Sequence, residues 1–457
     1  MHKSSKEIFL ACCLLVSGCG GARTAVAGHG TSDTEVAYAR SASGGEESTP
    51  AYGPPLSERE YASESGDGTY AAATSDAPAS SDVAATSIQS SPIMRAEAPR
   101  PEYVPPPAGL LTAATVGDAD RRDAYLDYLT RHANEASRLS LDMQRRVRFR
   151  VVDHAGRPVN DASIVVAGHF RGRTHADGVW DFYPSESAPG LTNQVGVVVN
   201  AGQLAVETSI RLGAGDGGDV TVRLEGATAR GATALDLAFV IDVTGSMEDE
   251  LRYVNREIAN IVARVHAEAA QTDIRVGAVF YRDRGDDEAL SHIQFTHDIG
   301  AFMQEMQNVA ASGGGDYPED MNEGLRAGME TLAWRTGNAV RAMVLIADAP
   351  PQNYTDVNFR YSDAMKSAAE RGIRILPVAA SGADRTTEFL MRAMGAFTST
   401  PYTYLTDDSG VGHGHMEADT DRVGVERFNE QLVRMLISDL RGTGMHEVGF
   451  LGPQLDQ

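Results

Sequence analysis

Residues 235–247 read LDLAFVIDVTGSM, an apolar run that ends in Asp242 and is followed by Thr244 and Ser246. The run is too short to cross a membrane, and its bounded, continuous apolar character predicts a buried β-strand. Open α/β sheets place their ligands at the carboxyl ends of their strands, which is where this turn begins. A carboxylate and two hydroxyl groups on one turn are oxygen ligands of the kind that Mg²⁺ prefers. The stretch therefore predicts a cation site at the end of a strand.

Two later segments extend this pattern. Residues 312–319 read SGGGDYPE, so that Asp316 follows three glycines and stands shortly before a helical pattern. Residues 343–351 read MVLIADAPP, a second apolar run that ends in an acid, Asp348. Glycines permit tight turns with positive φ and a close approach of the backbone to a ligand. We therefore expect these two loops to lie beside the first one.

The Asp-x-Thr-x-Ser spacing at 242–246 resembles the metal-ion-dependent adhesion site of von Willebrand factor type A (VWFA) domains, in which two further loops complete the site. Many members have a threonine after the glycines of the second loop, and an acid at that place is similar to the hemicentin-like branch of the family. The resemblance implies Mg²⁺, or Mn²⁺ or Ca²⁺, held by five side chains: Asp242, Thr244, Ser246, Asp316 and Asp348. The alternative is that the acids only terminate strands and that the hydroxyl groups cap a helix.

The pattern around these loops predicts an α/β fold with a doubly wound, mostly parallel sheet, VWFA or Rossmann-like, over residues 234–441. Strand-like apolar runs alternate with amphipathic helical patterns, as in parallel sheets that are covered on both faces. We expect further strands at 274–281, 292–297, 371–378 and 402–405, and helices at 251–265, 320–334, 356–371, 385–394 and 425–440. Pro377 cannot donate to a central ladder, so we expect it at the carboxyl end of its strand.

Two smaller units are predicted ahead of this sheet. Residues 118–145 form a helical pattern with Asp118 as its cap. Residues 146–226 contain short alternating strands with Gly and Asp turns, which predict a small all-β, Ig-like sandwich with a hairpin over 206–224. This string resembles carboxypeptidase regulatory-like modules, which implies a structural spacer or a carbohydrate-binding module. Residues 442–457 are expected to be a C-terminal tail.

The amino terminus predicts export. Lys3 and Lys6 precede a short apolar core, which is the pattern of a signal peptide over residues 1–18. The small residues before Cys19 resemble a bacterial lipobox, which implies cleavage before Cys19, acylation of its thiol and a bacterial lipoprotein. With Gly20 after the cysteine, the resemblance favours the outer membrane over the inner one. The alternative is an ordinary secretory signal in which Cys19 is incidental.

Composition narrows the class of protein further. Residues 19–109 are rich in Ser, Ala, Gly, Glu and Pro, which predicts a disordered tether. The formal net charge of −23 argues against nucleic-acid binding and against docking on an anionic membrane surface. No nucleophile elbow, Walker loop, dinucleotide fingerprint or HExxH motif occurs, so we expect no enzyme activity. Arg284-Gly285-Asp286 is interpreted as part of the fold rather than as an adhesion motif, and residues 413–417 as a solvated loop rather than a transition-metal site.

Together these features predict a surface-tethered, divalent-metal-dependent protein-binding or adhesion module in the bacterial cell envelope. A protein ligand would complete the metal shell with an acidic side chain, because Mg²⁺ keeps exchangeable positions. A third carboxylate at Asp316 would lower the positive charge of the site, and we therefore expect modest affinity. The alternatives are an envelope structural or assembly factor in which the metal only stabilises the fold, and a metal-dependent hydrolase.

Overall fold

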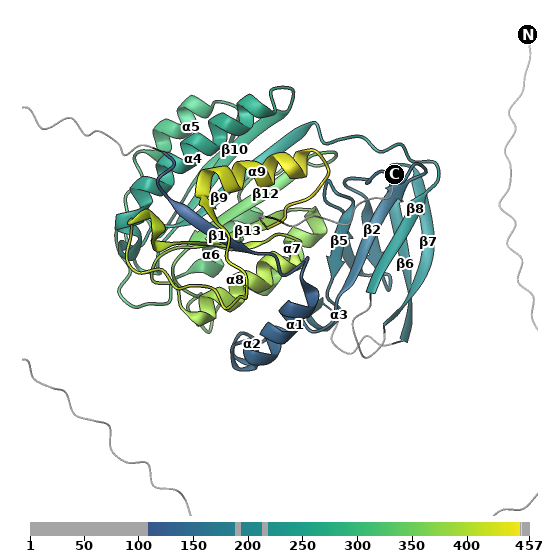
Figure 1. Ribbon diagram of the computed structural model, residues 1–457, viewed down its shortest axis with the longest axis horizontal. Coiled ribbons are helices and arrows are strands. Elements are labelled where there is room, and N and C mark those ends of the chain that lie inside the picture. The colour runs from purple at the N-terminus through teal and green to yellow at the C-terminus, as the bar shows by residue number, and fades with distance from the viewer. Residues whose placement is uncertain (1–107, 188–192, 213–217, 448, 450–457) are drawn as a thin grey trace, which may run out of the picture. The chain divides into compact units, whose positions relative to one another are not determined.

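The computed structural model describes residues 108–187, 193–212, 218–447 and 449 (Figure 1). The predicted signal peptide over 1–18, the acylation of Cys19, nearly all of the tether over 19–109 and the tail from residue 450 onward lie outside these residues. Within the described part of the chain, no helix is long and apolar enough to cross a membrane.

A large sheet forms the centre of the protein. Among the described residues it has eight strands in the order β11-β10-β9-β12-β13-β14-β1-β15. The five strands from β10 to β14 in this order are parallel, whereas β11, β1 and β15 pair antiparallel at the two sides. The bounds are β1 (Thr112–Val116), β9 (Ala234–Asp242), β10 (Asp273–Tyr281), β11 (Leu290–Thr296), β12 (Val340–Ala347), β13 (Arg374–Ala379), β14 (Tyr402–Leu405) and β15 (Val425–Arg427). The predicted mostly parallel sheet is confirmed.

Helices cover both faces of this sheet, which makes it doubly wound (Figure 1). Along β9, residues 237, 239 and 241 pack with one set of helices and residues 238 and 240 with the other, because successive side chains of a strand point to opposite faces. The first set is α4 (Glu248–Glu268), α5 (Ile299–Met306) and α9 (Phe428–Leu440), and the second is α6 (Met321–Glu330), α7 (Tyr361–Arg371) and α8 (Arg385–Phe397). All nine residues of β9 are buried, which explains its continuous apolar run.

The structure adds a strand that the sequence pattern did not indicate. β1 precedes the sandwich in the chain, yet it lies in the large sheet, where Ala113 is opposite Leu405 and Thr112 is opposite Arg427. The segment between β1 and β9 is therefore an insertion into the large domain. It contains α1 (Arg122–Arg131), α2 (Ala133–Leu139) and the sandwich.

The inserted sandwich consists of two small sheets. One has the order β5-β2-β8 and the other β4-β3-β6-β7, and the predicted all-β sandwich is confirmed. Its elements are β2 (Val147–Asp153), β3 (Ser163–Val166), β4 (Phe170–Arg173), β5 (Val179–Phe182), α3 (Pro184–Ser187), β6 (Asn193–Ala201), β7 (Leu204–Leu212) and β8 (Gly218–Leu224). The predicted hairpin over 206–224 is wrong, because β7 pairs with β6 and β8 pairs with β2 in the other sheet.

The predicted single helix over 118–145 is also corrected. The structure has two helices that meet at His132, and neither is capped by Asp118. Asp118 is buried and accepts hydrogen bonds from Arg392 of α8 at 2.8 Å (Nε) and 2.6 Å (Nη2). An acid that sequence reasoning assigned to a helix end instead ties the insertion to the large domain.

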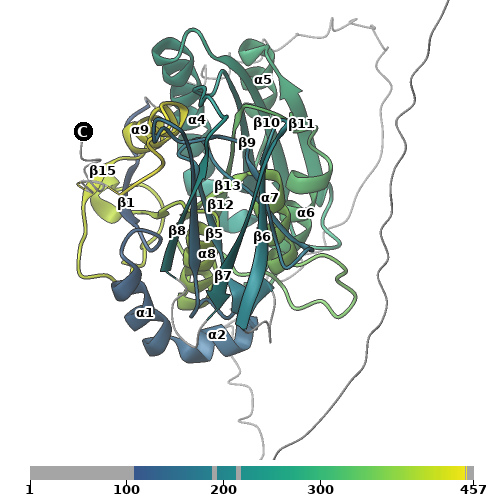
Figure 2. The ribbon, with the colours of Figure 1, turned by 90° about the vertical axis from the view of Figure 1, so that its right-hand side faces the viewer.

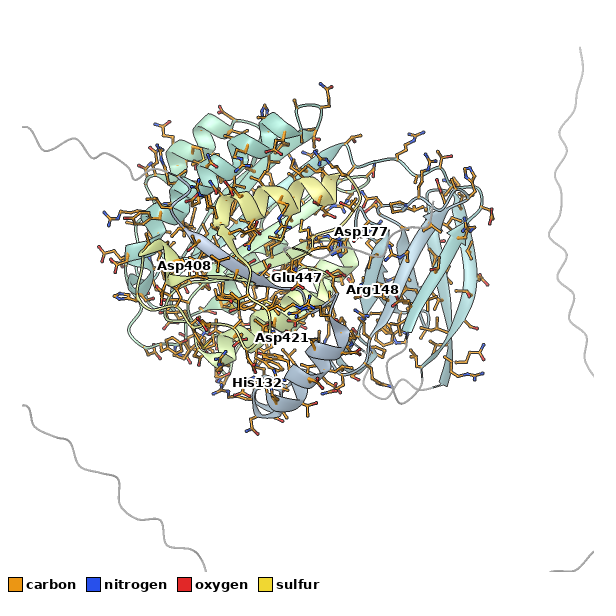
Figure 3. All side chains as sticks on the ribbon, viewed as in Figure 1. His132, Arg148, Asp177, Asp408, Asp421 and Glu447 are labelled. Carbon is orange, nitrogen blue, oxygen red and sulfur yellow. The ribbon has the colours of Figure 1, made fainter. Side chains whose placement is uncertain are left out.

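The sandwich contacts the large domain at the amino ends of the strands. Arg374, the first residue of β13, is fully buried and donates to Asp177 of the sandwich at 2.8 Å and to Asp439 of α9 at 3.1 Å. Asp177 lies at this boundary in Figure 3, and Figure 2 looks onto the same side of the molecule. The sandwich therefore lies at the amino ends of the strands, whereas Asp242 lies at the opposite edge of the sheet, formed by their carboxyl ends. Pro377 lies inside β13 rather than at its end, and pairing with β14 begins only at Val378.

Candidate metal centre

The first loop of the predicted site folds around the Asp242 carboxylate. Asp242 ends β9 and is fully buried, and its Oδ1 accepts from the Thr244 main-chain N–H at 3.0 Å and from the Thr244 hydroxyl at 2.7 Å. The Thr244 and Ser246 hydroxyl oxygens lie 3.2 Å apart. The 3₁₀ turn Gly245–Met247 leads directly into α4, so the local sequence orders all three side chains at one strand end.

The other two loops meet the first one there. The Gly245 N–H donates to the Gly313 carbonyl at 3.1 Å, which attaches the glycine loop to the first loop. Asp348 directly follows β12, the parallel neighbour of β9, and is 2% exposed. A hydrogen bond with the Ser246 hydroxyl opposes the effect of burial on the pKa of Asp348. Asp242, Thr244, Ser246 and Asp348 are thus brought together as the sequence predicted.

The glycine loop supplies Glu319 to this cluster. Glu319 is 3% exposed, and its main chain pairs with the segment after β12, donating to Pro350 O at 3.1 Å and accepting from Gln352 N at 2.8 Å. A Cβ added at Gly314 would lie 2.9 Å from Glu319 Oε1 and 3.4 Å from Thr244 Cβ. Glu319 therefore faces the first loop across a glycine that leaves room for it.

Asp316 is not part of the cluster. Its side chain is exposed, and its Oδ2 accepts from Gln352 Nε2 at 2.7 Å. The loop turns through positive φ at Gly313 and Gly314, and its backbone then pairs with residues 350–352. This pairing directs Glu319, and not Asp316, inward. Sequence reasoning missed Glu319, although an acid beside a proline at the start of a helix was a signal that could have identified it.

The pKa of each of the three buried carboxyl groups is raised. Burial and the charge of Asp348 raise the pKa of Asp242 to about 7. Burial, followed by the charge of Asp242, raises the pKa of Glu319 to about 9, and burial raises the pKa of Asp348 as well. Asp242 Oδ2, Glu319 Oε2 and Asp348 Oδ1 are buried without a hydrogen-bond partner. Like charges held together out of water are costly, and a cation is the group that would offset that cost.

The donor set fits a hard divalent cation. In the described residues, no three or more His, Cys, Asp or Glu side chains are placed so that they alone could hold a metal ion. The candidate centre combines carboxylates with the hydroxyl groups of Thr244 and Ser246, and such mixed oxygen donors suit Mg²⁺ together with water. Neither a thiol nor an imidazole belongs to it, which disfavours zinc or copper.

Two other motifs from the sequence have structural roles. In Arg284-Gly285-Asp286, the Asp286 carboxylate accepts from Gly314 N at 2.8 Å, and Arg284 pairs with Asp320 at 2.9 Å. The tripeptide therefore supports the glycine loop, in line with its interpretation as part of the fold. His415 is not solvated as expected. Its ring lies between Glu250 at 2.7 Å and Asp407 at 2.8 Å, with 3% of the side chain exposed.

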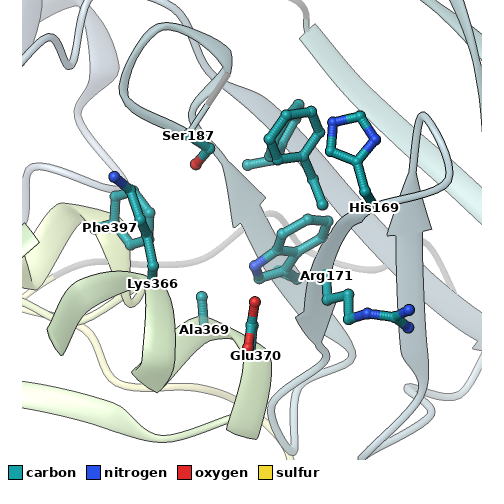
Figure 4. A pocket seen from close by; sticks show the side chains of 10 residues that line it. His169, Arg171, Ser187, Lys366, Ala369, Glu370 and Phe397 are labelled. Atoms are coloured by element: carbon teal, nitrogen blue, oxygen red, sulfur yellow. The ribbon is translucent and has the colours of Figure 1, made fainter. Parts of the chain in front are cut away.

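A small cavity lies elsewhere, between the sandwich and α7 (Figure 4). Its volume is about 80 Å³, and it is lined by aromatic side chains that include Phe170, Trp180 and Phe397, with Lys366 and Glu370 at its rim. None of its lining residues belongs to the loops of the candidate centre. We therefore treat the two sites separately.

Part of the chain matches a known family. Residues 236–413 match the family model of the von Willebrand factor A domain. The match begins in β9 and includes the three loops of the candidate centre, whereas β1, the inserted sandwich and α9 lie outside it. The resemblance seen in the sequence to a von Willebrand factor A domain is thus confirmed at this level.

Two individual proteins are similar to parts of the chain. An alpha-protein kinase, vwkA, from Dictyostelium discoideum is 28% identical over 130 residues, which cover 28% of this chain. The chain spans about a fifth (20%) of the length of that curated relative. Among solved structures, the pilus adhesin SpaC from Lactobacillus rhamnosus GG, in an open conformation, aligns with 13% identity and a TM-score of 0.32. That alignment covers 55% of this chain and 32% of the adhesin.

Proposed function

We propose that this chain is a divalent-metal-dependent protein-binding module of the von Willebrand factor A type. The metal, with Mg²⁺ the first candidate and Mn²⁺ or Ca²⁺ the others, would be held by Asp242, Thr244, Ser246 and Asp348. Glu319 replaces Asp316 as the third acid in this proposal. The observation that carries it is the set of buried, unpartnered carboxylate oxygens on Asp242, Glu319 and Asp348.

The residues of the centre divide into a fixed side and an open side. Asp242 and Thr244 are fully buried and bonded to each other, so they hold their oxygens in place before any ligand arrives. Ser246 is exposed and marks the side from which a partner would approach. When bound, the divalent cation supplies a positive centre that an oxygen of the partner can complete.

The charge of the donor set bears on affinity. Two carboxylates, those of Asp242 and Asp348, would hold the cation, and the nearby Glu319 carboxylate would lower the positive charge of the centre further, so an acidic partner would be attracted weakly. In the sequence this reasoning concerned Asp316, and here we apply it to Glu319, which is buried. We therefore propose modest affinity for a single carboxylate, with selectivity supplied by the surrounding loops.

The proposed location is the bacterial cell envelope, with a lipid anchor at Cys19 and the outer membrane favoured. This part rests on the sequence pattern of residues 1–19 alone. Metabolic labelling with a palmitate analogue tests it, because the label should appear in the wild-type protein and be absent from Cys19→Ser. A labelled Cys19→Ser variant would contradict the anchor without affecting the metal centre.

Calorimetric titration with Mg²⁺ and Mn²⁺ tests the centre itself. We expect binding by the wild-type protein and by Asp316→Ala, and none by Asp242→Ala or Glu319→Gln. Loss of binding in Asp316→Ala alone would indicate that Asp316, and not Glu319, is the metal ligand.

A pull-down from envelope extracts with Mg²⁺ against EDTA then separates the proposed function from its alternatives. A metal that raises thermal stability with no metal-dependent partner would indicate a structural factor, and EDTA-sensitive hydrolysis would indicate an enzyme.

A further inference from the structure

The sheet edge that carries the candidate centre is strongly acidic. Because the central strands are parallel, the loops that follow β9, β10, β12, β13 and β14 all meet at the edge of Asp242. Exposed carboxylates lie at the start of α4 (Glu248 and Asp249), in the glycine loop between α5 and α6 (Asp316), after β12 (Asp356) and after β14 (Asp407 and Asp408). They surround a cluster that already contains three buried acids.

Two arginines of this surface, Arg282 and Arg284, make contacts within the protein. Arg282 is buried and donates to main-chain carbonyl groups, whereas Arg360, just before α7, is exposed. Arg284 pairs with Asp320 at 2.9 Å and with Asp356 at 2.7 Å. A partner with a purely acidic surface would therefore meet repulsion around the centre, whereas a basic one would be attracted.

One aromatic side chain stands out in this surface. Tyr317 is 44% exposed, and its hydroxyl donates to Asp348 O at 3.3 Å and Gly382 O at 3.1 Å, which fixes the ring beside the centre. Its neighbour Asp316 is exposed and accepts a hydrogen bond from Gln352. Among the described residues, no cation stacks on Tyr317 or pairs with Asp316.

On the same surface, an arginine of the protein itself lies between an aromatic ring and a carboxylate. The Arg284 guanidinium lies 4.1 Å from the centre of the Tyr354 ring and pairs with Asp356. A cation held between an aromatic face and a carboxylate is thus a contact that this edge already makes internally. Tyr317 and Asp316 are adjacent in the glycine loop, and both expose the same kinds of group to solvent.

We propose that Tyr317 and Asp316 form a subsite for a lysine or arginine side chain of the partner. The partner is then a basic protein segment that presents one carboxylate between cationic residues. The carboxylate reaches the metal centre while the neighbouring cation lies on Tyr317 and pairs with Asp316. This inference rests on the proposed function, because it assigns the partner of the same site.

Fluorescence anisotropy with short labelled peptides tests the subsite, with the full chain in Mn²⁺. The peptides have a central aspartate flanked by lysines, by acetyl-lysines or by glutamates. We expect the lysine-flanked peptide to bind most tightly, and Tyr317→Ala and Asp316→Asn each to weaken it by roughly two- to fivefold. Tyr317→Phe keeps the ring and should bind nearly as the wild type does. Asp408→Asn removes the same charge from another loop of this edge and should have the smallest effect.

The outcomes separate this inference from the proposed function. Calorimetry should give the same Mn²⁺ affinity for the wild type, Tyr317→Ala and Asp316→Asn. If Mn²⁺ binds but the glutamate-flanked peptide binds equally well, or no peptide binds, the subsite is wrong and the metal centre stands. An equal loss of peptide affinity in Asp408→Asn would also overturn the subsite, because the effect would then come from the overall negative charge of this surface. If the wild type does not bind Mn²⁺, the proposed function itself is wrong.

Discussion

Asp242→Asn should stabilise the protein in EDTA and remove its stabilisation by metal. The pKa of Asp242 is raised from 3.8 to about 7, chiefly by burial and then by Asp348. At about 1.4 kcal/mol per pKa unit, the ionised carboxylate destabilises the metal-free fold by about 4 kcal/mol at pH 8. The hydrogen bonds from Thr244 lower this pKa and are already included in that figure, and asparagine keeps an acceptor for them. The expected gain is therefore about 4 kcal/mol at pH 8.

The pH dependence of this gain has a definite sign. The folded-state pKa of Asp242 lies above its unfolded value, so ionisation penalises the fold fully above pH of about 7. The penalty declines as the pH falls and is absent below the unfolded value of about 4. Asp242→Asn should therefore exceed the wild type in stability at pH 8 and lose most of this advantage near pH 4.5.

Urea unfolding monitored by circular dichroism, in EDTA and in Mg²⁺, measures both effects. Metal that binds only the folded state stabilises it by about 2.7 kcal/mol at a hundred times its dissociation constant. This increment should appear in the wild type and in Asp316→Asn, the matched control, and be absent from Asp242→Asn. The reasoning is refuted if Asp242→Asn is the less stable protein in EDTA at pH 8, or if Mg²⁺ stabilises both proteins equally.

Three further perturbations test other parts of the structure. Arg374→Met leaves buried acids unpaired at the sandwich boundary and should cost about 3–5 kcal/mol in urea unfolding; a loss below 1 kcal/mol would contradict that role. Burial raises the pKa of Asp181, but the charge of Arg148 and the hydrogen bonds to the carboxylate lower it by more, so the pKa lies well below its usual value. The stabilisation of the fold by this carboxylate is therefore present above pH of about 4 and lost as the pH falls below it. Asp181→Asn should therefore flatten the acid limb of the stability curve, and an unchanged limb would exclude it. Gly314→Ala should weaken Mn²⁺ binding about tenfold in calorimetry, because φ is +77° and the new Cβ would lie 2.9 Å from Glu319. Gly315→Ala, with open space around its Cβ, should bind normally.

The parts of the site that depend on local sequence could be predicted from it. Asp242, Thr244 and Ser246 lie on one turn after an apolar strand, so their convergence follows from the strand and its turn. Asp348 ends a second such strand, and parallel neighbours place their carboxyl ends together. The choice between Asp316 and Glu319 could not be made in the same way. Both acids are in one loop, and their directions depend on backbone pairing with residues 350–352.

The long-range features were also beyond the sequence pattern. β1 is short and made of small and β-branched residues, and its partners lie about three hundred residues later in the chain. Nothing local marks it as part of the large sheet. The Arg374–Asp177 pair could not be predicted either, because each residue alone resembles an ordinary surface charge near a strand. Such contacts are specified by tertiary packing and not by periodicity.

The position of β1 determines which elements first bear a pulling force that is applied through the chain ahead of the domain. The main-chain N–H groups of Gly109 and Leu110 donate to Glu257 Oε1 at 2.7 and 3.0 Å, and the strand follows directly. Tension applied through the chain ahead of residue 108 therefore reaches the large sheet and α4 first and bypasses the sandwich. Since α4 begins at Glu248, two residues after Ser246, such a pull acts on the helix that carries the candidate centre at its start.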